Sequence, residues 1–155
     1  PVVSLPVADE HYQEPFVRDH VRFGFLPGGY AQRDFAERPG VRSLYRRYMP
    51  ALLACARAGW EPVTHARSNA AAVKVERFGR PGGELLLSIV SQLDQPTRTR
   101  VFVEATPLGL ALKTIGTQDL ISGRTIDWRP EADRLVADVA LDAAQAIVLR
   151  LHPSA

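Results

Sequence analysis

Residues 73–90 read VKVERFGRPGGELLLSIV, and this stretch predicts two β-strands joined by a glycine-rich turn. In its first half, valine alternates with Lys74 and Glu76, which is the two-residue period of a strand with one buried face. Gly82-Gly83 interrupts the pattern before a second apolar run at residues 84–90. We therefore expect a β-hairpin here, and its glycines to form a turn rather than a nucleotide-binding loop.

Further short strands are predicted downstream, at a spacing of about ten residues. Turn residues separate them, for example at Asp94-Gln95-Pro96 and Ser122-Gly123. Short strands with this spacing and turn chemistry are typical of an antiparallel β-sandwich. The expected strands lie at 99–104, 112–115, 120–121, 125–126, 135–141 and 146–151.

A different pattern precedes the strands. From Val41 to Ala58 apolar residues recur at three- and four-residue steps, which predicts a helix, kinked at Pro50 and capped by Gly59. Residues 1–40 are rich in proline and glycine and are expected to be irregular, with one short strand at Val21–Leu26. The change of period at Trp60 predicts two parts, residues 1–59 and a sandwich domain at residues 60–155.

The composition excludes several classes of protein. The chain has 155 residues, of which 46% are hydrophobic and 23% charged, as is common in soluble globular proteins. No apolar run approaches the roughly 20 residues of a membrane span, and no signal-peptide pattern begins the chain. The formal charge is only +2 and no basic cluster stands out, so nucleic-acid binding is not predicted. Compartment is left open.

The single cysteine, Cys55, excludes an internal disulfide and is expected to be a buried small hydrophobe. His11, His20 and Asp19 lack the spacing of metal ligands, and His65 is expected to pack at the junction before the strands. Motifs for nucleotide binding or an activated serine are missing from the sequence, so neither a cofactor nor a metal is predicted.

Five motifs, taken in their order along the chain, carry a resemblance to a known family. They are AGWEPVTHA (58–66), VKVERFG (73–79), GELLL (83–87), LISGR (120–124) and VLRL (148–151). In this order, after a helix, they resemble the C-terminal end of multidomain glycoside hydrolases and hydrolase-like proteins. There a (β/α)8 barrel finishes in a helix and passes directly into an all-β sandwich. The resemblance covers residues 41–152 well and residues 20–40 weakly.

The resemblance implies an α+β fold: an N-terminal partial (β/α)-barrel-like segment with one kinked helix, then an antiparallel β-sandwich. Arg22–Leu26 would be the last barrel strand and Pro27–Gly40 its loop on the catalytic face. A complete barrel takes about 250 residues, so the paired catalytic carboxylates would lie outside this chain. The implied role is an accessory, non-catalytic one that braces the barrel. The implied partner is the rest of a barrel domain, or a partner chain, packing on residues 1–59.

Carbohydrate is the expected ligand class, and aromatic side chains are the candidate contacts. Tyr30 would lie on the catalytic face, Trp128 is expected to be exposed at a strand end, and Tyr12 is a third candidate. Trp60 is expected instead to seal the helix against the sandwich.

Two alternatives remain open. The first is a self-standing carbohydrate-binding module with Trp128 on an exposed platform. The second is a small acid/base enzyme that uses Glu10, His11 and Glu14, because residues four apart share one face of a helix. An exposed apolar stripe on the helix at 41–55 would favour a bracing role over both alternatives.

Overall fold

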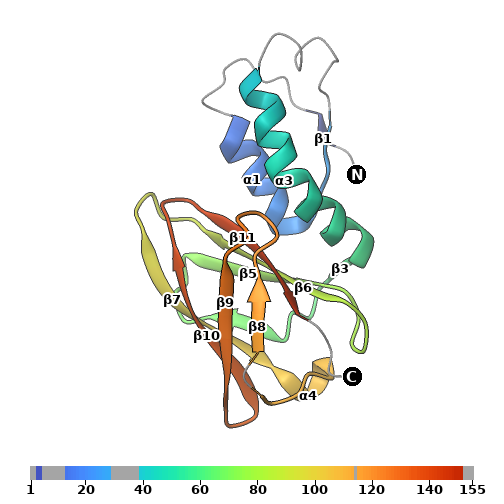
Figure 1. The fold of residues 1–155 in the computed structure, drawn as a ribbon, viewed down its shortest axis with the longest axis vertical. Coiled ribbons are helices and arrows are strands. Elements are labelled where there is room, and N and C mark those ends of the chain that lie inside the picture. The colour runs from blue at the N-terminus through green and yellow to red at the C-terminus, as the bar shows by residue number, and fades with distance from the viewer. Residues whose placement is uncertain (1–2, 5–12, 29–38, 114, 152–155) are drawn as a thin grey trace.

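The computed structural model describes residues 3–4, 13–28, 39–113 and 115–151, and within them two stacked antiparallel sheets carry two helices on one side (Figure 1). The five-stranded sheet has the order β4 (Ala66–Ser68), β7 (Thr97–Glu104), β10 (Arg134–Leu141), β9 (Thr125–Glu131), β8 (Ile115–Gln118). The four-stranded sheet has the order β11 (Ala146–Leu151), β6 (Leu85–Ser91), β5 (Val73–Phe78), β3 (Trp60–Glu61). A short helix, α4 (Ala105–Leu108), follows β7. The predicted α+β fold with a β-sandwich is confirmed.

The predicted hairpin at 73–90 is also confirmed. β5 pairs antiparallel with β6, in a register that places Val75 opposite Ile89. Gly79 has a φ of +90°, and a Cβ there would stand 2.0 Å from the carbonyl oxygen of Glu84. Only glycine tolerates both conditions, so the glycine is fixed by the close approach of the two chain segments.

Two of the predicted strands are displaced. The strand expected at 112–115 begins only at Ile115, and Leu120–Ile121 belongs to the turn between β8 and β9. Apolar side chains at 120–121 resemble a short strand in sequence. They are instead partly buried against the cluster beneath the helices.

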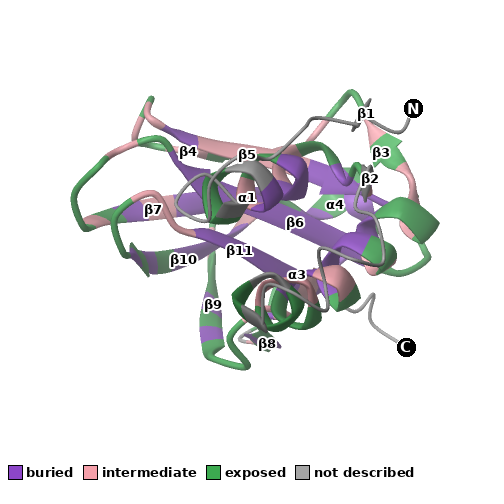
Figure 2. Cartoon of the chain, turned by 90° about the horizontal axis from the view of Figure 1, so that it is seen from above, coloured by how far each residue is buried: buried purple, intermediate pink, exposed green. Residues whose placement is uncertain are grey.

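Strand β6 lies in the middle layer, and all seven of its residues are buried. Leu85, Leu87 and Ile89 face the other sheet, whereas Leu86 and Val90 face the helices. Figure 2 shows β6 and β11 buried beneath the two helices. A strand covered on both faces needs no polar alternation, which explains the continuous apolar run in the sequence.

The helix predicted at 41–58 is confirmed as α3 (Pro39–Ala58), with Pro50 inside it. The irregular structure and the strand predicted before it are wrong where the structure describes them. Helix α1 (Gln13–Phe23) covers the start of the predicted strand, and Gly24, with a φ of +63°, follows the helix in the left-handed conformation. The helix forms because Val17 and Val21, four residues apart, bury one face against the sheet.

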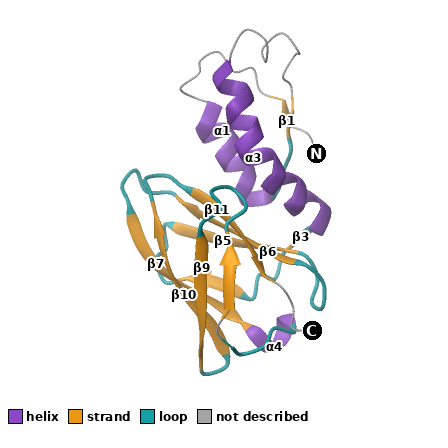
Figure 3. Cartoon of the chain, in the orientation of Figure 1, coloured by secondary structure: helices purple, strands orange, loops and turns teal. Residues whose placement is uncertain are grey.

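The strand expected at Arg22–Leu26 is wrong: Arg22 lies in α1, and the next strand is β2 (Pro27–Gly28), which pairs in parallel with β1 (Val3–Ser4). The order β1-α1-β2-α3 is therefore a parallel βαβ unit followed by a second helix, and the helical and strand layers stand apart in Figure 3. The loop expected at 27–40 falls mostly outside the described residues. No described helix is long and apolar enough to cross a bilayer.

Candidate functional site

A buried seam lies between the two helices and the outer face of the four-stranded sheet. It is the second of two hydrophobic clusters, and each of its buried members is at most 4% exposed. Because apolar burial is the main favourable term in folding, this seam joins the two parts of the chain tightly. The helices contribute Val17, Val21, Tyr48, Ala51, Leu52 and Cys55, and the sheet contributes Phe78, Leu86, Val90, Ala146 and Val148.

Polar contacts fix the position of α1 on the sheet. Ser88 donates its hydroxyl to the carbonyl oxygen of Arg22 at 3.1 Å. Arg18 donates to the carbonyl oxygen of Ala144 at 2.9 Å, and Arg22 forms an ion pair with Glu76 at 3.3 Å. A Cβ at Gly24 would approach the Phe78 ring to 2.6 Å. The helix end is therefore held by both hydrogen bonds and close packing.

Burial suppresses the reactivity of two groups in the seam. It raises the pKa of the Cys55 thiol to about 12, with the charge of Glu84 adding to the effect, so this cysteine stays neutral and is not an activated nucleophile. The expectation that Cys55 is a buried hydrophobe is confirmed. Burial, followed by the hydrogen bond to Glu14, raises the pKa of Tyr48 to about 12.

Glu14 is the described member of the acidic region considered as a small acid/base site; Glu10 and His11 lie outside the described residues. Its carboxylate accepts the Tyr48 hydroxyl at 2.9 Å and pairs with Arg47 at 3.1 Å. It borders a hollow of about 390 Å³ between α1, α3 and the turn before β11. These contacts link α1 to α3, which is a structural role for Glu14.

Two expectations about tryptophan are wrong. Trp128 is fully buried in the sandwich core, where its indole N–H donates to the Thr117 hydroxyl at 2.9 Å, so it offers no ring face to a ligand. Trp60 does not seal the helix against the sandwich: it is 49% exposed, and its indole N–H donates to Glu76 at 3.2 Å. Phe78, paired with Trp60 across β3 and β5, fills that position instead.

The other two aromatic candidates, Tyr30 and Tyr12, lie outside the described residues and stay predictions. Among the residues that the structure describes, no three histidine, cysteine or acidic side chains gather as a metal site requires. Of the three predicted carbohydrate contacts, the described part of the chain holds Trp128 alone, and it is buried.

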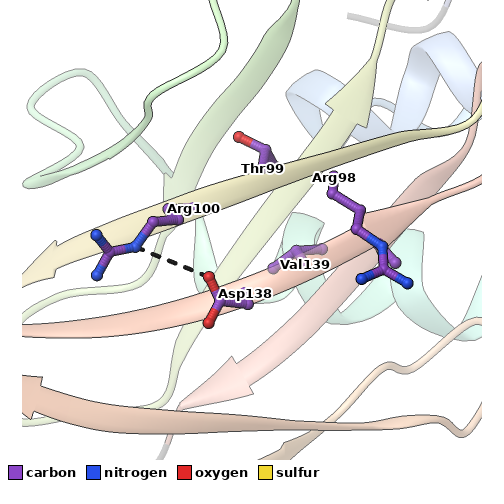
Figure 4. A pocket seen from close by; sticks show the side chains of 6 residues that line it. Arg98, Thr99, Arg100, Asp138 and Val139 are labelled. Atoms are coloured by element: carbon purple, nitrogen blue, oxygen red, sulfur yellow. Dashed lines mark ion pairs between the residues drawn. The ribbon is translucent and has the colours of Figure 1, made fainter.

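A shallow hollow of about 250 Å³ lies along β7 and β10 (Figure 4). Arg98 and Arg100 border it from β7 and Asp138 from β10, and Arg100 and Asp138 stand 3.8 Å apart. Asp138 also pairs with Arg129 at 2.7 Å. The acid at this hollow is therefore already neutralised by neighbouring guanidinium groups.

The motif at residues 120–124 owes its structure to Asp119, which sequence reasoning missed. This carboxylate is 0% exposed and accepts the backbone N–H groups of Ser122 at 3.0 Å and Val148 at 2.9 Å. It also accepts the N–H of Ile121 and the Ser122 hydroxyl. Asp119 thus ties the β8–β9 turn to β11 of the other sheet, and the Asp-x-x-Ser-Gly spacing of the turn is the signal that could have revealed it.

No protein-family model and no curated protein matches the chain. Solved structures do match. A noncanonic maltogenic alpha-amylase AmyB from Thermotoga neapolitana shares the fold with a TM-score of 0.59 at 12% identity, over 89% of this chain and 36% of that one. A putative alpha-N-acetylgalactosaminidase from Bacillus halodurans matches with a TM-score of 0.55 at 12% identity, over 90% of this chain and 31% of that one. AmyP, solved in complex with maltose, matches with a TM-score of 0.55 at 12% identity, over 97% of this chain and 37% of that one.

The chain thus spans about a third of the length of these structures while most of its own length is matched. At such identities the likeness concerns the fold. The expected structural resemblance to part of multidomain glycoside hydrolases is confirmed at this level, and the chain has the fold of a segment of such proteins.

Proposed function

We propose that this chain is the C-terminal accessory portion of a glycoside hydrolase-like protein, and that it is itself non-catalytic. Residues 1–59 are the last two β/α units of a barrel, and residues 60–155 are a sandwich domain that braces them. The observation that carries this proposal is the parallel β1-α1-β2 unit, followed by α3 and packed through a buried seam onto the sandwich. The partial coverage of the amylase structures supports it.

Apolar surface that the sandwich leaves uncovered gives further support. The apolar stripe that would favour bracing if it were exposed on α3 is instead buried, because its members Tyr48, Leu52 and Cys55 face the sandwich, so the stripe does not favour bracing over the alternatives. Leu53 lies on another side of α3 and is 36% exposed. At the end of α1, the rings of Phe23 and Phe25 stack at 5.9 Å and are each 38% exposed. The two exposed rings, adjacent at one surface, favour a packing partner at this end of α1. The rest of a barrel domain, or a partner chain, fits this position.

The proposal of a carbohydrate partner rests on the likeness to the solved structures. Amylases and a putative galactosaminidase among the matched structures support a carbohydrate ligand for the whole protein. We assign the contacts from this chain to Tyr30, on the expected catalytic face, and to Tyr12. We place the pair of catalytic carboxylates that the retaining and inverting mechanisms need on earlier strands of the barrel, as the resemblance implies.

Two measurements test the proposal. The 155-residue chain is expected not to hydrolyse chromogenic α-glucosides or α-galactosides, and turnover by this chain would refute its non-catalytic role. The intact mass of the native protein from its source is expected to exceed that of 155 residues several-fold. A native mass equal to that of the 155-residue chain would refute the assignment to a larger barrel protein.

A further inference from the structure

The outer face of the five-stranded sheet carries a hollow of about 680 Å³ that the bracing role does not use. Its walls are the segment 62–67, Phe102 and Glu104 of β7, and Asp133–Arg134 at the β9–β10 turn. Ligand pockets commonly have volumes of about 300–1,000 Å³. The hollow lies on the sheet opposite the helices, so its occupation does not compete with the seam.

Three guanidinium groups surround one aromatic ring at this hollow. Those of Arg67, Arg100 and Arg134 stand 5.3, 5.4 and 5.0 Å from the centre of the Phe102 ring. Arg100 is engaged, because it donates to both carboxylate oxygens of Glu131 at 2.6 and 2.7 Å. These cation–π contacts restrain the guanidinium groups, which reduces the entropy that a ligand would cost on binding.

Arg67 and Arg134 border the hollow with donors still available. Neither forms an ion pair with a carboxylate among the described residues, and Arg134 Nε is buried there without a hydrogen-bond partner. The guanidinium N–H groups of these two residues are therefore the donors that a polar ligand in the hollow would meet.

The same hollow also offers acceptors. His65 Nδ1 lies 2.8 Å from Glu104 Oε2, and because a carboxylate only accepts, the imidazole donates from this nitrogen. In the neutral ring Nε2 is then an acceptor, and it has no partner in the described part of the chain. Asp133 adds a carboxylate.

The backbone at His65 is also specifically held. Its φ is +49°, in the left-handed region, which carries a conformational cost for a residue other than glycine. The hydrogen bond from the Glu104 N–H to the His65 carbonyl at 2.8 Å and the side-chain contact together maintain it. The imidazole is thus fixed at the wall of the hollow.

We propose that this hollow binds a neutral oligosaccharide. Each sugar hydroxyl donates one hydrogen bond and accepts others, so neighbouring hydroxyls match a site that sets guanidinium donors beside carboxylate and imidazole acceptors. An anion would meet Glu104 and Asp133, and a cation would meet Arg67 and Arg134. The choice of a glycan among neutral polyols rests on the proposed function.

The test is a titration of the 155-residue chain with maltotriose and, separately, melibiose, followed by amide chemical shifts. Saturable shifts are expected at residues 62–67, 102–104 and 133–134 with at least one of the two sugars. Arg134→Ala and Arg67→Ala are each expected to weaken binding by about tenfold or more, since each removes charged hydrogen-bond donors. Arg98→Ala is the matched control, because Arg98 lies on the same strand as Phe102 and does not border this hollow.

Arg67→Lys separates planar hydrogen bonding from charge. It is expected to weaken binding nearly as much as Arg67→Ala, because lysine keeps the charge and loses the planar fork. Unchanged amide spectra with both sugars, binding that survives both alanine variants, or tighter binding of glucuronate than of maltotriose would each overturn the proposal. These outcomes leave the bracing role unaffected, since hydrolysis assays and native mass test that role separately.

Discussion

Replacing Leu52 by alanine tests the seam directly. Leu52 lies in α3, is 0% exposed and belongs to the cluster between the helices and the four-stranded sheet. The substitution removes apolar contacts and leaves a cavity, a combination that costs about 2–5 kcal/mol in well-packed cores. Its surroundings include β-sheet side chains that cannot follow the shortened residue, so we expect a loss of about 3 kcal/mol in the free energy of unfolding.

Urea denaturation, followed by far-UV circular dichroism and tryptophan fluorescence, measures the effect. A loss of about 3 kcal/mol corresponds to a midpoint lowered by about 1–2 M for ordinary urea dependences. In a Trp60→Phe background, which leaves Trp128 as the single tryptophan, the helical signal at 222 nm is expected to fall earlier than the tryptophan emission, because Trp128 lies in the separate sandwich core. The perturbation acts at the seam, so the helices are expected to detach first.

Leu53→Ala is the matched control. It makes the same chemical change one residue along the same helix, at a side chain that is 36% exposed, and is expected to alter stability by no more than about 0.5 kcal/mol. A cost below about 1 kcal/mol for Leu52→Ala, or an equal cost for both variants, would show that the reasoning about the seam is wrong.

Four further predictions concern buried groups. Asp119→Ala removes the acceptor of four hydrogen bonds and is expected to lower the free energy of unfolding, measured by urea denaturation, by about 3 kcal/mol or more. A loss below about 1 kcal/mol would contradict the role of Asp119 in joining the β8–β9 turn to β11. Cys55 is expected to resist thiol reagents at pH 8 until the protein is unfolded; rapid labelling of the native protein would contradict its burial. The pKa of the Cys55 thiol is about 12 in the folded protein and 9.0 ordinarily, so the unfolded chain loses the thiol proton first as the pH rises. The thiol's contribution to stability is therefore complete below pH 9 and is lost as the pH rises toward 12. Stability should therefore fall less steeply in Cys55→Ala than in the parent over that interval; equal slopes would contradict the shift. Gly24→Ala is expected to lower the melting temperature, because the new residue would have a φ of +63° and a Cβ 2.6 Å from the Phe78 ring. Gly82→Ala is the control: its φ of +82° retains the backbone strain, but the Cβ would enter open space and meet no clash. Equal losses in both glycine variants would show that the close approach to Phe78 is unimportant.

Helix α1 shows where the local pattern was insufficient. Its apolar positions, Val17 and Val21, are separated by Arg18, Asp19 and His20, and prolines surround the segment. The local pattern there is too short and too interrupted to outweigh those breakers. Packing against β6 and α3 stabilises the helix, and such long-range burial is invisible in an eleven-residue window.

The sugar-stacking role expected of Trp128 failed for a related reason. Alternation along β9 shows that Ile126 and Trp128 share a face. That face is the inner one only because β9 pairs with β8 and β10 and the other sheet covers it. Had the register slipped by one residue, the same tryptophan would be exposed. The hollow at Phe102 likewise joins residues from β4, β7 and β10, which no sequence spacing brings together.

The sequence by itself determined the two-residue period after Trp60, the hairpin at 73–90, the helix around Leu52 and hence the class of a helix followed by a sandwich. Hydrophobic periodicity and turn residues act over about ten residues, so they can be recognised without the fold. Only the tertiary structure decided which faces meet: the second face of β6 beneath the helices, the burial of Trp128 and the gathering of donors and acceptors beside Phe102. The geometry of those contacts depends on register and sheet packing, which local sequence does not specify.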